Sequence, residues 1–269
     1  MNVVEELKKA RKGGYAVGAF NTANLEVTKA ICTAAAKFDV PILIQTTPSA
    51  IKYAGLEQLY EIVTNEIHAT GIEAAIHLDH AKEFADIIAA VRIGYKSVMF
   101  DGSKLPYDEN VRETHQVVKF AHEYGVCVEG EIGVIGKEEG GHYSGKSQLS
   151  TPEQVLEFID STGVDSIAVS VGNEHGAPED EKLNINLLRQ IGEIINIPLV
   201  MHGASGLSVG DIRQATGCGV AKFNIDTAIK RAFTNELETS KESDYREVIK
   251  DGMEEVEKIV AGYIKLFGS

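Results

Sequence analysis

The most informative segment of this chain is Glu73-Ala74-Ala75-Ile76-His77-Leu78-Asp79-His80. It begins as an apolar run typical of a buried parallel strand and ends with a carboxylate and an imidazole side by side. Two further apolar runs are also followed by a histidine, His175 in one case and His202 in the other. Neighbouring parallel strands share one carboxyl edge, so the sequence predicts that His80, His175 and His202 converge there on one metal ion.

Apolar runs of this kind alternate with helical patterns along the whole chain. The eight predicted strands cover residues 15–20, 41–46, 73–77, 97–100, 126–132, 165–171, 197–201 and 220–225. Eight strand–helix units in 269 residues predict the α/β class, as a (β/α)8 TIM barrel that forms one catalytic domain over residues 1–269. An extra C-terminal helix is predicted from Tyr245 to about Phe267, and Thr151 and Ser208 are the expected N-caps of two other helices.

Composition and charge exclude several classes of partner. The chain is 43% hydrophobic and 25% charged, and its apolar runs fall far short of the roughly 20 residues that cross a bilayer. No signal-peptide core follows Met1, so a cytoplasmic location is expected. A net charge of -14 and a pI near 5.0 argue against a nucleic-acid partner. Three cysteines without a CxxC pair indicate neither a disulfide framework nor a thiolate zinc site.

Polar side chains follow nearly every predicted strand, which is where a barrel carries its active site. Three neutral imidazoles would leave coordination positions of a Zn²⁺ ion open, and such an ion polarises a carbonyl. Small residues at Gly203-Ala204-Ser205-Gly206 and the turn Asn224-Ile225-Asp226-Thr227 would expose backbone N–H groups to a phosphate. The other polar strand ends hold Asn21, Thr46, Thr47, Asp79, Asp101 and Glu131.

The longest irregular stretch covers residues 136–150 and is rich in glycine. A glycine-rich insertion after a barrel strand is typical of an active-site lid. An ordinary surface loop remains the alternative at this point.

These residues belong to motifs that together resemble one known family, the class II metal-dependent ketose-bisphosphate aldolases of the fructose/tagatose-bisphosphate type. The resemblance runs nearly from end to end. The motifs that carry it are Gly18-Ala19-Phe20-Asn21, Lys52-Tyr53-Ala54-Gly55, His77-Leu78-Asp79-His80-Ala81, Ser97-Val98-Met99-Phe100-Asp101-Gly102-Ser103, Glu129-Gly130-Glu131-Ile132-Gly133, His202-Gly203-Ala204-Ser205-Gly206-Leu207, Phe223-Asn224-Ile225-Asp226-Thr227 and Leu266-Phe267-Gly268-Ser269.

The resemblance implies an activity and a role for each matching residue. The expected reaction is reversible cleavage of fructose 1,6-bisphosphate to dihydroxyacetone phosphate and glyceraldehyde 3-phosphate. The enzyme is expected to depend on zinc and to form a homodimer or homotetramer. Asp79 would handle the C4 hydroxyl proton, and Glu139 in the lid would exchange a proton with the dihydroxyacetone phosphate carbon. His80, His175 and His202 would hold zinc, with Asp101 and Glu131 as an alternative metal position. Substrate, often alongside Na⁺ or K⁺, would contact Asn21, Thr47, Gly176, Gly203, Ala204, Ser205, Asn224, Ile225, Asp226 and Thr227.

Three departures from the family pattern bear on the substrate. Met253 stands where the family commonly has an arginine that grips the distal phosphate. Asn173-Glu174 replaces a small Thr-Ala pair, and Lys137 replaces a loop glycine. Tagatose 1,6-bisphosphate, or a ketose 1-phosphate without the distal phosphate, is therefore an open alternative.

Other classes of function make different demands on the sequence. A barrel metallohydrolase usually begins with His-x-His on the first strand, which Ala19-Phe20-Asn21 does not provide. A Schiff-base aldolase needs a buried lysine, for which Lys222 is the candidate. A non-catalytic sugar-phosphate-binding protein is the third alternative, and loss of activity on chelation would separate it from an enzyme.

Overall fold

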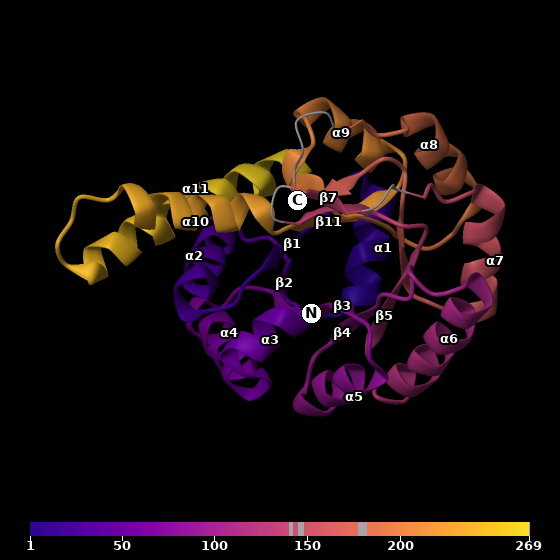
Figure 1. The fold of residues 1–269 in the computed structure, drawn as a ribbon, viewed down its shortest axis with the longest axis horizontal. Coiled ribbons are helices and arrows are strands. Elements are labelled where there is room, and N and C mark those ends of the chain that lie inside the picture. Colours follow the sequence, from indigo (N-terminus) through magenta and orange to yellow (C-terminus); the bar gives the residue numbers. More distant parts are fainter. Residues whose placement is uncertain (140–141, 145–147, 177–181, 269) are drawn as a thin grey trace.

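The computed structural model describes residues 1–139, 142–144, 148–176 and 182–268, with the backbone alone for 136–139 and 142–144. Eight parallel strands close into a barrel in the order β1-β11-β10-β8-β5-β4-β3-β2, which follows the order of the chain (Figure 1). The predicted (β/α)8 barrel is thus confirmed. The barrel strands are β1 (Val17–Asn21), β2 (Ile42–Thr46), β3 (Ala74–Ala81), β4 (Ser97–Phe100), β5 (Cys127–Ile132), β8 (Ser166–Val169), β10 (Leu199–Met201) and β11 (Val220–Ile225).

Helices surround the barrel and bury one face against it. They are α2 (Leu25–Ala36), α4 (Leu56–Thr70), α5 (Phe84–Ile93), α6 (Tyr107–Glu123), α7 (Pro152–Thr162), α8 (Ile185–Ile194), α9 (Val209–Gly217), α10 (Thr227–Thr239) and α11 (Tyr245–Phe267), with the short α3 (Pro48–Ala54) after β2. The predicted caps are confirmed, since Thr151 accepts from the N–H of Gln154 and Ser208 from that of Asp211. No helix in the described ranges could span a bilayer.

The amino-terminal helix α1 (Val3–Gly13) closes one end of the barrel. Its Val3, Leu7 and Ala10 are buried in a cluster with residues near the starts of the strands, including Ala75 and Ala221. The carboxyl ends of the strands, where the histidines were predicted, therefore lie at the opposite end.

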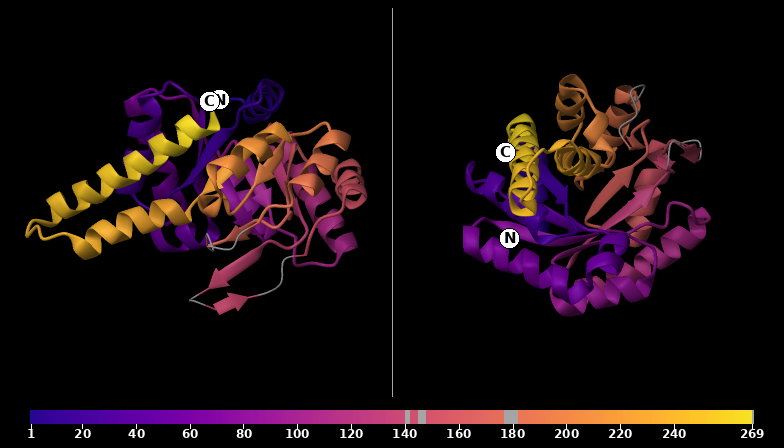
Figure 2. Two further views of the ribbon diagram at one scale, coloured as in Figure 1. Left: turned by 90° about the horizontal axis from the view of Figure 1, so that it is seen from above. Right: turned by 60° about the vertical axis from the view of Figure 1, so that its left-hand side comes forward.

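The extra C-terminal helix is confirmed as α11, which pairs with α10 in a helical hairpin that projects beyond the barrel (Figure 2). The carboxyl end of α11 contacts the barrel, because the Ala16 N–H donates to the Phe267 carbonyl at 3.1 Å. The Phe267 ring also stacks on Phe223 of β11, with ring centroids 5.0 Å apart. The hairpin is therefore anchored at its base.

The glycine-rich stretch differs from the irregular loop that was expected. Its backbone forms β6 (Gly136–Glu139) and β7 (His142–Ser144), an antiparallel pair. β6 also pairs in parallel with β9 (Glu174–His175), which gives a small sheet in the order β7-β6-β9. The prediction of irregular backbone was wrong because the partner strand comes from a segment distant in sequence.

Candidate functional site

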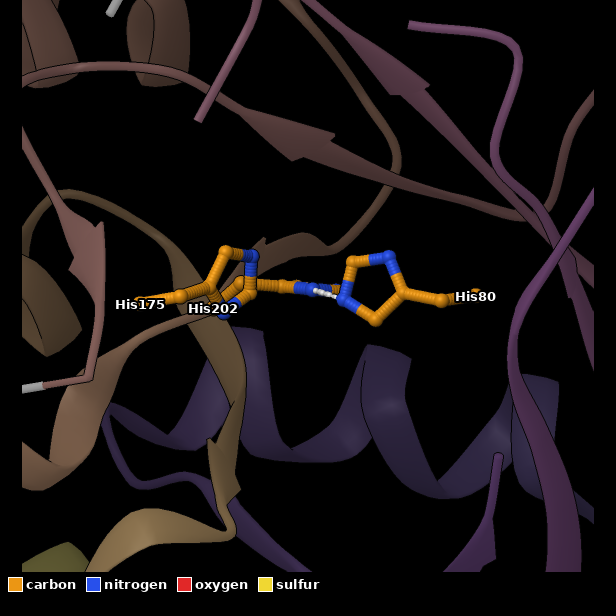
Figure 3. A group of neighbouring side chains, drawn as sticks. All are labelled: His80, His175 and His202. Carbon is orange, nitrogen blue, oxygen red and sulfur yellow. Dashed lines mark hydrogen bonds between the residues drawn. The ribbon is translucent and has the colours of Figure 1, made fainter. Parts of the chain in front are cut away.

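The three predicted histidines converge at the carboxyl end of the barrel. One ring nitrogen from each of His80, His175 and His202 lies within 4.8 Å of the others. The imidazoles face one another in Figure 3, with centroids 4.6 Å apart for His80–His202 and 5.0 Å for His80–His175. Nδ1 of His202 lies 2.9 Å from Nε2 of His80. These are distances at which one ion can take a ligand from each ring.

Local backbone geometry turns His80 toward this point. His80 has a φ of 56°, which is rare for a residue with a side chain. The pairing of β3 with β4 shifts register between Leu78 and Ala81, so His80 sits in a bulge. Bulges beside active sites re-aim side chains, and the left-handed conformation here has that effect.

Gly203 lets the His175 segment approach His202. Its φ is 71°, and a Cβ built on it would lie 2.1 Å from the carbonyl oxygen of Glu174. No side chain fits in that space, so the glycine is required for β9 to pass this close to the end of β10.

Two carboxylates approach the histidines from the other side. Oδ2 of Asp101 lies 3.0 Å from Nδ1 of His80, and its Oδ1 accepts from the Ser103 hydroxyl at 2.7 Å. Oε2 of Glu131 lies 3.9 Å from Nδ1 of both His80 and His202. His80, Asp101 and Glu131 form a second group that could hold a metal ion.

The charges of the cluster suit a cation. Burial opposes protonation of His80, but Asp79, Asp101 and Glu131 outweigh it and raise its pKa to about 10. Burial and the neighbouring Asp101 raise the pKa of Glu131 to about 8. Burial lowers the pKa of His175 and His202 well below the usual value, which keeps both imidazoles neutral as metal ligands must be.

One buried oxygen strengthens the fit to a metal. Oε2 of Glu131 is buried and has no hydrogen-bond partner among the described residues. Buried polar atoms normally have a partner, so such an atom 3.9 Å from the nitrogens of two imidazoles favours a bound cation. Three imidazole nitrogens with a carboxylate oxygen nearby are donors of the kind that catalytic zinc sites use.

Asp79 lies beside the histidines with its carboxylate oriented by two amides. Asn21 donates to Oδ2 at 2.9 Å and Asn224 to Oδ1 at 3.2 Å. Burial would raise the pKa of Asp79, but His80, His202 and Lys222 outweigh it and lower the pKa below its usual value. The buried carboxylate is thus held ionised and ready to accept a proton.

A cavity of about 670 Å³ opens above these groups and contains most of the predicted site. Its cationic residues are Lys82, Lys104, Lys230 and Arg231. Ala204 and Ile225 were also predicted to bind substrate but do not line the cavity, since both are buried in the core. The predicted residues that line it are Asn21, Thr47, Asp79, His80, Asp101, Glu131, His175, Gly176, His202, Gly203, Ser205, Asn224, Asp226 and Thr227.

The backbone of Glu139 belongs to β6, but its side chain lies outside the described part of the chain. The β6–β9 pairing brings the strand of Glu139 to His175, because Lys137 pairs with His175 in register. The glycine-rich segment is thereby connected to a predicted metal ligand.

Sequence reasoning missed Glu129, which touches His202. Oε1 of Glu129 accepts from Nε2 of His202 at 2.8 Å. Its Oε2 accepts from Lys222, the Schiff-base candidate, at 2.7 Å. The only signal for this pair was a charged residue inside each of two apolar strand patterns, Cys127–Ile132 and Val220–Ile225.

Comparisons with known proteins agree on one family. Residues 1–269 match the family described as fructose-bisphosphate aldolase class II. A fructose-bisphosphate aldolase of Streptococcus pyogenes serotype M3 is 40% identical, over 98% of this chain and 96% of that protein. The crystal structure of the YdjI aldolase from Escherichia coli K12 has a TM-score of 0.89 at 28% identity, covering 100% of this chain and 97% of that one. A fructose-bisphosphate aldolase from Campylobacter jejuni shares the fold, with a TM-score of 0.84 at 23% identity over 99% and 94% of the two chains.

Proposed function

Because the chain belongs to the class II fructose-bisphosphate aldolase family, we propose that it cleaves fructose 1,6-bisphosphate reversibly at the cavity above the three histidines. The products are dihydroxyacetone phosphate and glyceraldehyde 3-phosphate. The observation that carries this proposal is the convergence of His80, His175 and His202 beside the oriented carboxylate of Asp79.

His80, His175 and His202 are the proposed zinc ligands, and Asp101 and Glu131 are the proposed alternative position. When bound, zinc stabilises the negative charge that develops on the substrate's oxygens as the carbon–carbon bond breaks. The buried oxygen of Glu131, which has no hydrogen-bond partner in the described part of the chain, and the neutral imidazoles of His175 and His202 support this assignment.

Asp79 is the proposed base for the C4 hydroxyl. It accepts the hydroxyl proton as the C3–C4 bond breaks and the C4 oxygen becomes the aldehyde carbonyl. The bonding electrons stay with C3, which later takes a proton from Glu139. The two amides that donate to Asp79 support this role, because they hold its carboxylate in one orientation.

The phosphate of the dihydroxyacetone phosphate half is assigned to the turn that starts α10. The residues that line this part of the cavity are Gly176, Gly203, Ser205, Asn224, Asp226 and Thr227, whereas Ala204 and Ile225 are buried behind them. The first turn of α10 directs N–H groups toward an anion, and one of them, that of Ala228, donates to the Ser205 hydroxyl at 3.2 Å. A Na⁺ or K⁺ ion alongside the bound phosphate belongs to the same proposal.

The far end of the substrate distinguishes two candidates. Met253, at the expected arginine position, is partly buried and packs against the core. Thr47 and Ser49 line both the active-site cavity and a neighbouring pocket of about 290 Å³. Lys230 is the single cation among the described residues that line this pocket, and it is paired with Asp226. These features favour a ketose 1-phosphate, without the distal phosphate, as the second candidate.

A substrate panel with and without EDTA tests both candidates. The panel holds fructose and tagatose 1,6-bisphosphates and fructose 1-phosphate. We expect cleavage that EDTA abolishes and added Zn²⁺ restores. A strong preference for a bisphosphate would reject the ketose 1-phosphate candidate. Cleavage that EDTA leaves unchanged would reject the zinc assignment, and no cleavage of any sugar would reject the aldolase proposal.

The role of Glu139 needs a separate measurement, since the proton that it handles is on carbon. Glu139→Gln should slow exchange of the dihydroxyacetone phosphate C3 proton with solvent deuterium, followed by NMR, by about 10²–10⁴-fold. Wild-type exchange in the variant would exclude Glu139 as the group that protonates carbon.

A further inference from the structure

Charged side chains fill the barrel interior directly beneath the metal centre. Barrel interiors are usually filled by branched apolar residues. Here Lys222 of β11 and His77 of β3 have exposed fractions of 0%, and Glu129 of β5 has 1%. Lysine and glutamate are almost never this buried unless they are paired, so the group requires an explanation.

A continuous series of contacts joins these residues to His202. The hydroxyl of Ser97 lies 2.7 Å from Nδ1 of His77, whose Nε2 lies 3.2 Å from Nζ of Lys222. Nζ of Lys222 donates to Oε2 of Glu129 at 2.7 Å, and Oε1 of Glu129 lies 2.8 Å from Nε2 of His202. The four members come from β3, β4, β5 and β11, so the series crosses the barrel.

The contact with Glu129 determines which nitrogen of His202 can bind a metal. A carboxylate only accepts, so Nε2 of His202 must carry the proton that it donates to Glu129. Nδ1 is then the lone-pair nitrogen, and it is the one that lies 2.9 Å from Nε2 of His80.

Asn224 lies between His202 and Asp79. Its amide nitrogen lies 3.2 Å from Nε2 of His202 and 3.2 Å from Oδ1 of Asp79. The amide nitrogen and the protonated Nε2 are both donors, so of the two it is Asp79 that accepts a hydrogen bond from the amide. The series of contacts thus ends beside both the proposed ligand and the proposed base.

Lys222 itself is remote from substrate. It does not line the active-site cavity, and its ammonium is engaged by Glu129 and His77. These contacts place it below His202, where it can act on Glu129 but cannot reach a sugar.

We propose that Lys222 and Glu129 are positioning residues: their buried ion pair holds the Glu129 carboxylate against Nε2 of His202, so that Nδ1 faces the metal. Lys222 fixes Glu129, and Glu129 fixes the tautomer and ring orientation of His202. Partners of this kind raise metal affinity without touching the ion. The inference rests on the metal site proposed above.

Variants of the pair separate positioning from a purely structural role. Glu129→Gln and Lys222→Met each remove one charge with little change in shape, and a double variant removes both. Val17→Ala is the matched control, since Val17 is buried, pairs in register with Lys222 and makes none of these contacts. Zinc affinity is measured by competition with a chromogenic chelator, and the ligand field by the visible spectrum of the Co²⁺-loaded protein.

We expect each single variant to bind zinc about 10–100-fold more weakly and to change the Co²⁺ spectrum. The control should keep wild-type affinity and spectrum. The double variant should recover thermal stability relative to the singles, because no buried charge is left unpaired, yet still bind zinc weakly. If a single variant fails to fold, the double variant provides the test alone.

Wild-type zinc affinity and Co²⁺ spectrum in the folded variants would overturn the inference and leave the pair a structural feature. Failure of the wild-type protein to bind zinc would instead overturn the proposed function, so the two failures are distinguishable. Borohydride trapping with substrate provides the last check, since a trapped adduct at Lys222 would show that it reaches the substrate.

Discussion

In both His80 and His202, the two ring nitrogens have different partners. His80 presents Nε2 to His202 and Nδ1 to Asp101, and His202 presents Nδ1 to His80 and Nε2 to Glu129. A carboxylate on the far nitrogen fixes the tautomer of an imidazole ligand. Each of these two imidazoles is therefore oriented before a metal arrives, and His80, whose pKa is raised to about 10, would release a proton on becoming a ligand.

Asp79 provides the sharpest test at the residue scale. Asp79→Asn removes the proton acceptor and leaves the three imidazoles in place. We expect kcat to fall about 10²–10⁴-fold, as for other positioned bases. Zinc content, measured by mass spectrometry of the metal, should stay at the wild-type value.

Asp108→Asn is the matched control, because Asp108 is exposed on α6 and does not line the cavity. It should leave kcat unchanged. An Asp79→Asn enzyme with wild-type kcat would remove Asp79 from the mechanism, and one without zinc would show a structural role instead.

Cys32 gives a prediction about pH and stability. Burial and the nearby Glu66 raise the pKa of this thiol to about 12. The folded state thus holds the thiol proton more tightly than the unfolded state. Its contribution to stability is complete below about pH 9 and is lost as pH rises toward the folded pKa.

Between pH 8 and pH 10 this thiol should account for about 1 kcal/mol of lost unfolding free energy. Cys32→Ala should reduce the pH-dependent loss by that amount in urea titrations at the two pH values. Val27→Ala on the same helix is the control for the cavity and should keep the wild-type pH dependence. An unchanged slope in Cys32→Ala would contradict the prediction.

At the scale of elements, α1 closes the end of the barrel opposite the active site. Its Arg11 donates to the carbonyl oxygens of Gly192, Ile195 and Ile197, where α8 ends and β10 approaches. Helix ends leave carbonyls without partners, and the guanidinium satisfies several at once. Arg11 therefore fastens α1 to the barrel.

Arg11→Met should lower the unfolding free energy by about 3 kcal/mol, because hydrogen bonds to a charged group are lost from a half-buried position. Urea denaturation of the metal-free protein measures this effect. Lys12→Met, an exposed change on the same helix, should alter stability little. The kcat of both variants should equal that of the wild type, and a lower kcat in Arg11→Met would show that the two ends of the barrel are coupled.

Across the whole molecule, the residues that stabilise the barrel end and those proposed for catalysis lie at opposite ends of the barrel. Helix α1 and its apolar cluster lie at the amino ends of the strands, and the cavity with the histidines lies at the carboxyl ends. Barrel enzymes divide their two ends in this way. Both ends share one barrel, which supports the proposal of a single domain over residues 1–269.

Thermal unfolding tests that proposal together with the metal. A single domain should unfold in one calorimetric transition in EDTA. Zinc at about 100 times its Kd should add about 2.7 kcal/mol, or roughly 5–10 °C in Tm for a chain of this size. Two separate transitions would contradict the single domain, and an unchanged Tm would contradict the metal site. Sedimentation of the same samples tests the proposed dimer or tetramer.

Much of the fold followed from local sequence patterns. Strands 97–100 and 220–225 begin and end at the predicted residues, and so does the last helix, because these boundaries are set by nearby polar and glycine residues. The positions of His80, His175 and His202 at one edge of the barrel could be predicted as well, because the carboxyl ends of all its parallel strands lie at that edge. Glu129 could not be assigned, because one charged residue in an apolar strand does not reveal its partner.

Local sequence patterns were sufficient to predict the eight-strand barrel, the edge at which its polar residues gather and the residue types available there. The bulge that turns His80 inward, the pairing of β6 with β9, and the ion pair between Lys222 and Glu129 could be seen only in the folded barrel. The difference is one of separation along the chain. Strand and helix periodicity is expressed by neighbours along the chain, whereas register shifts and buried charge pairs depend on residues that meet only when the barrel closes.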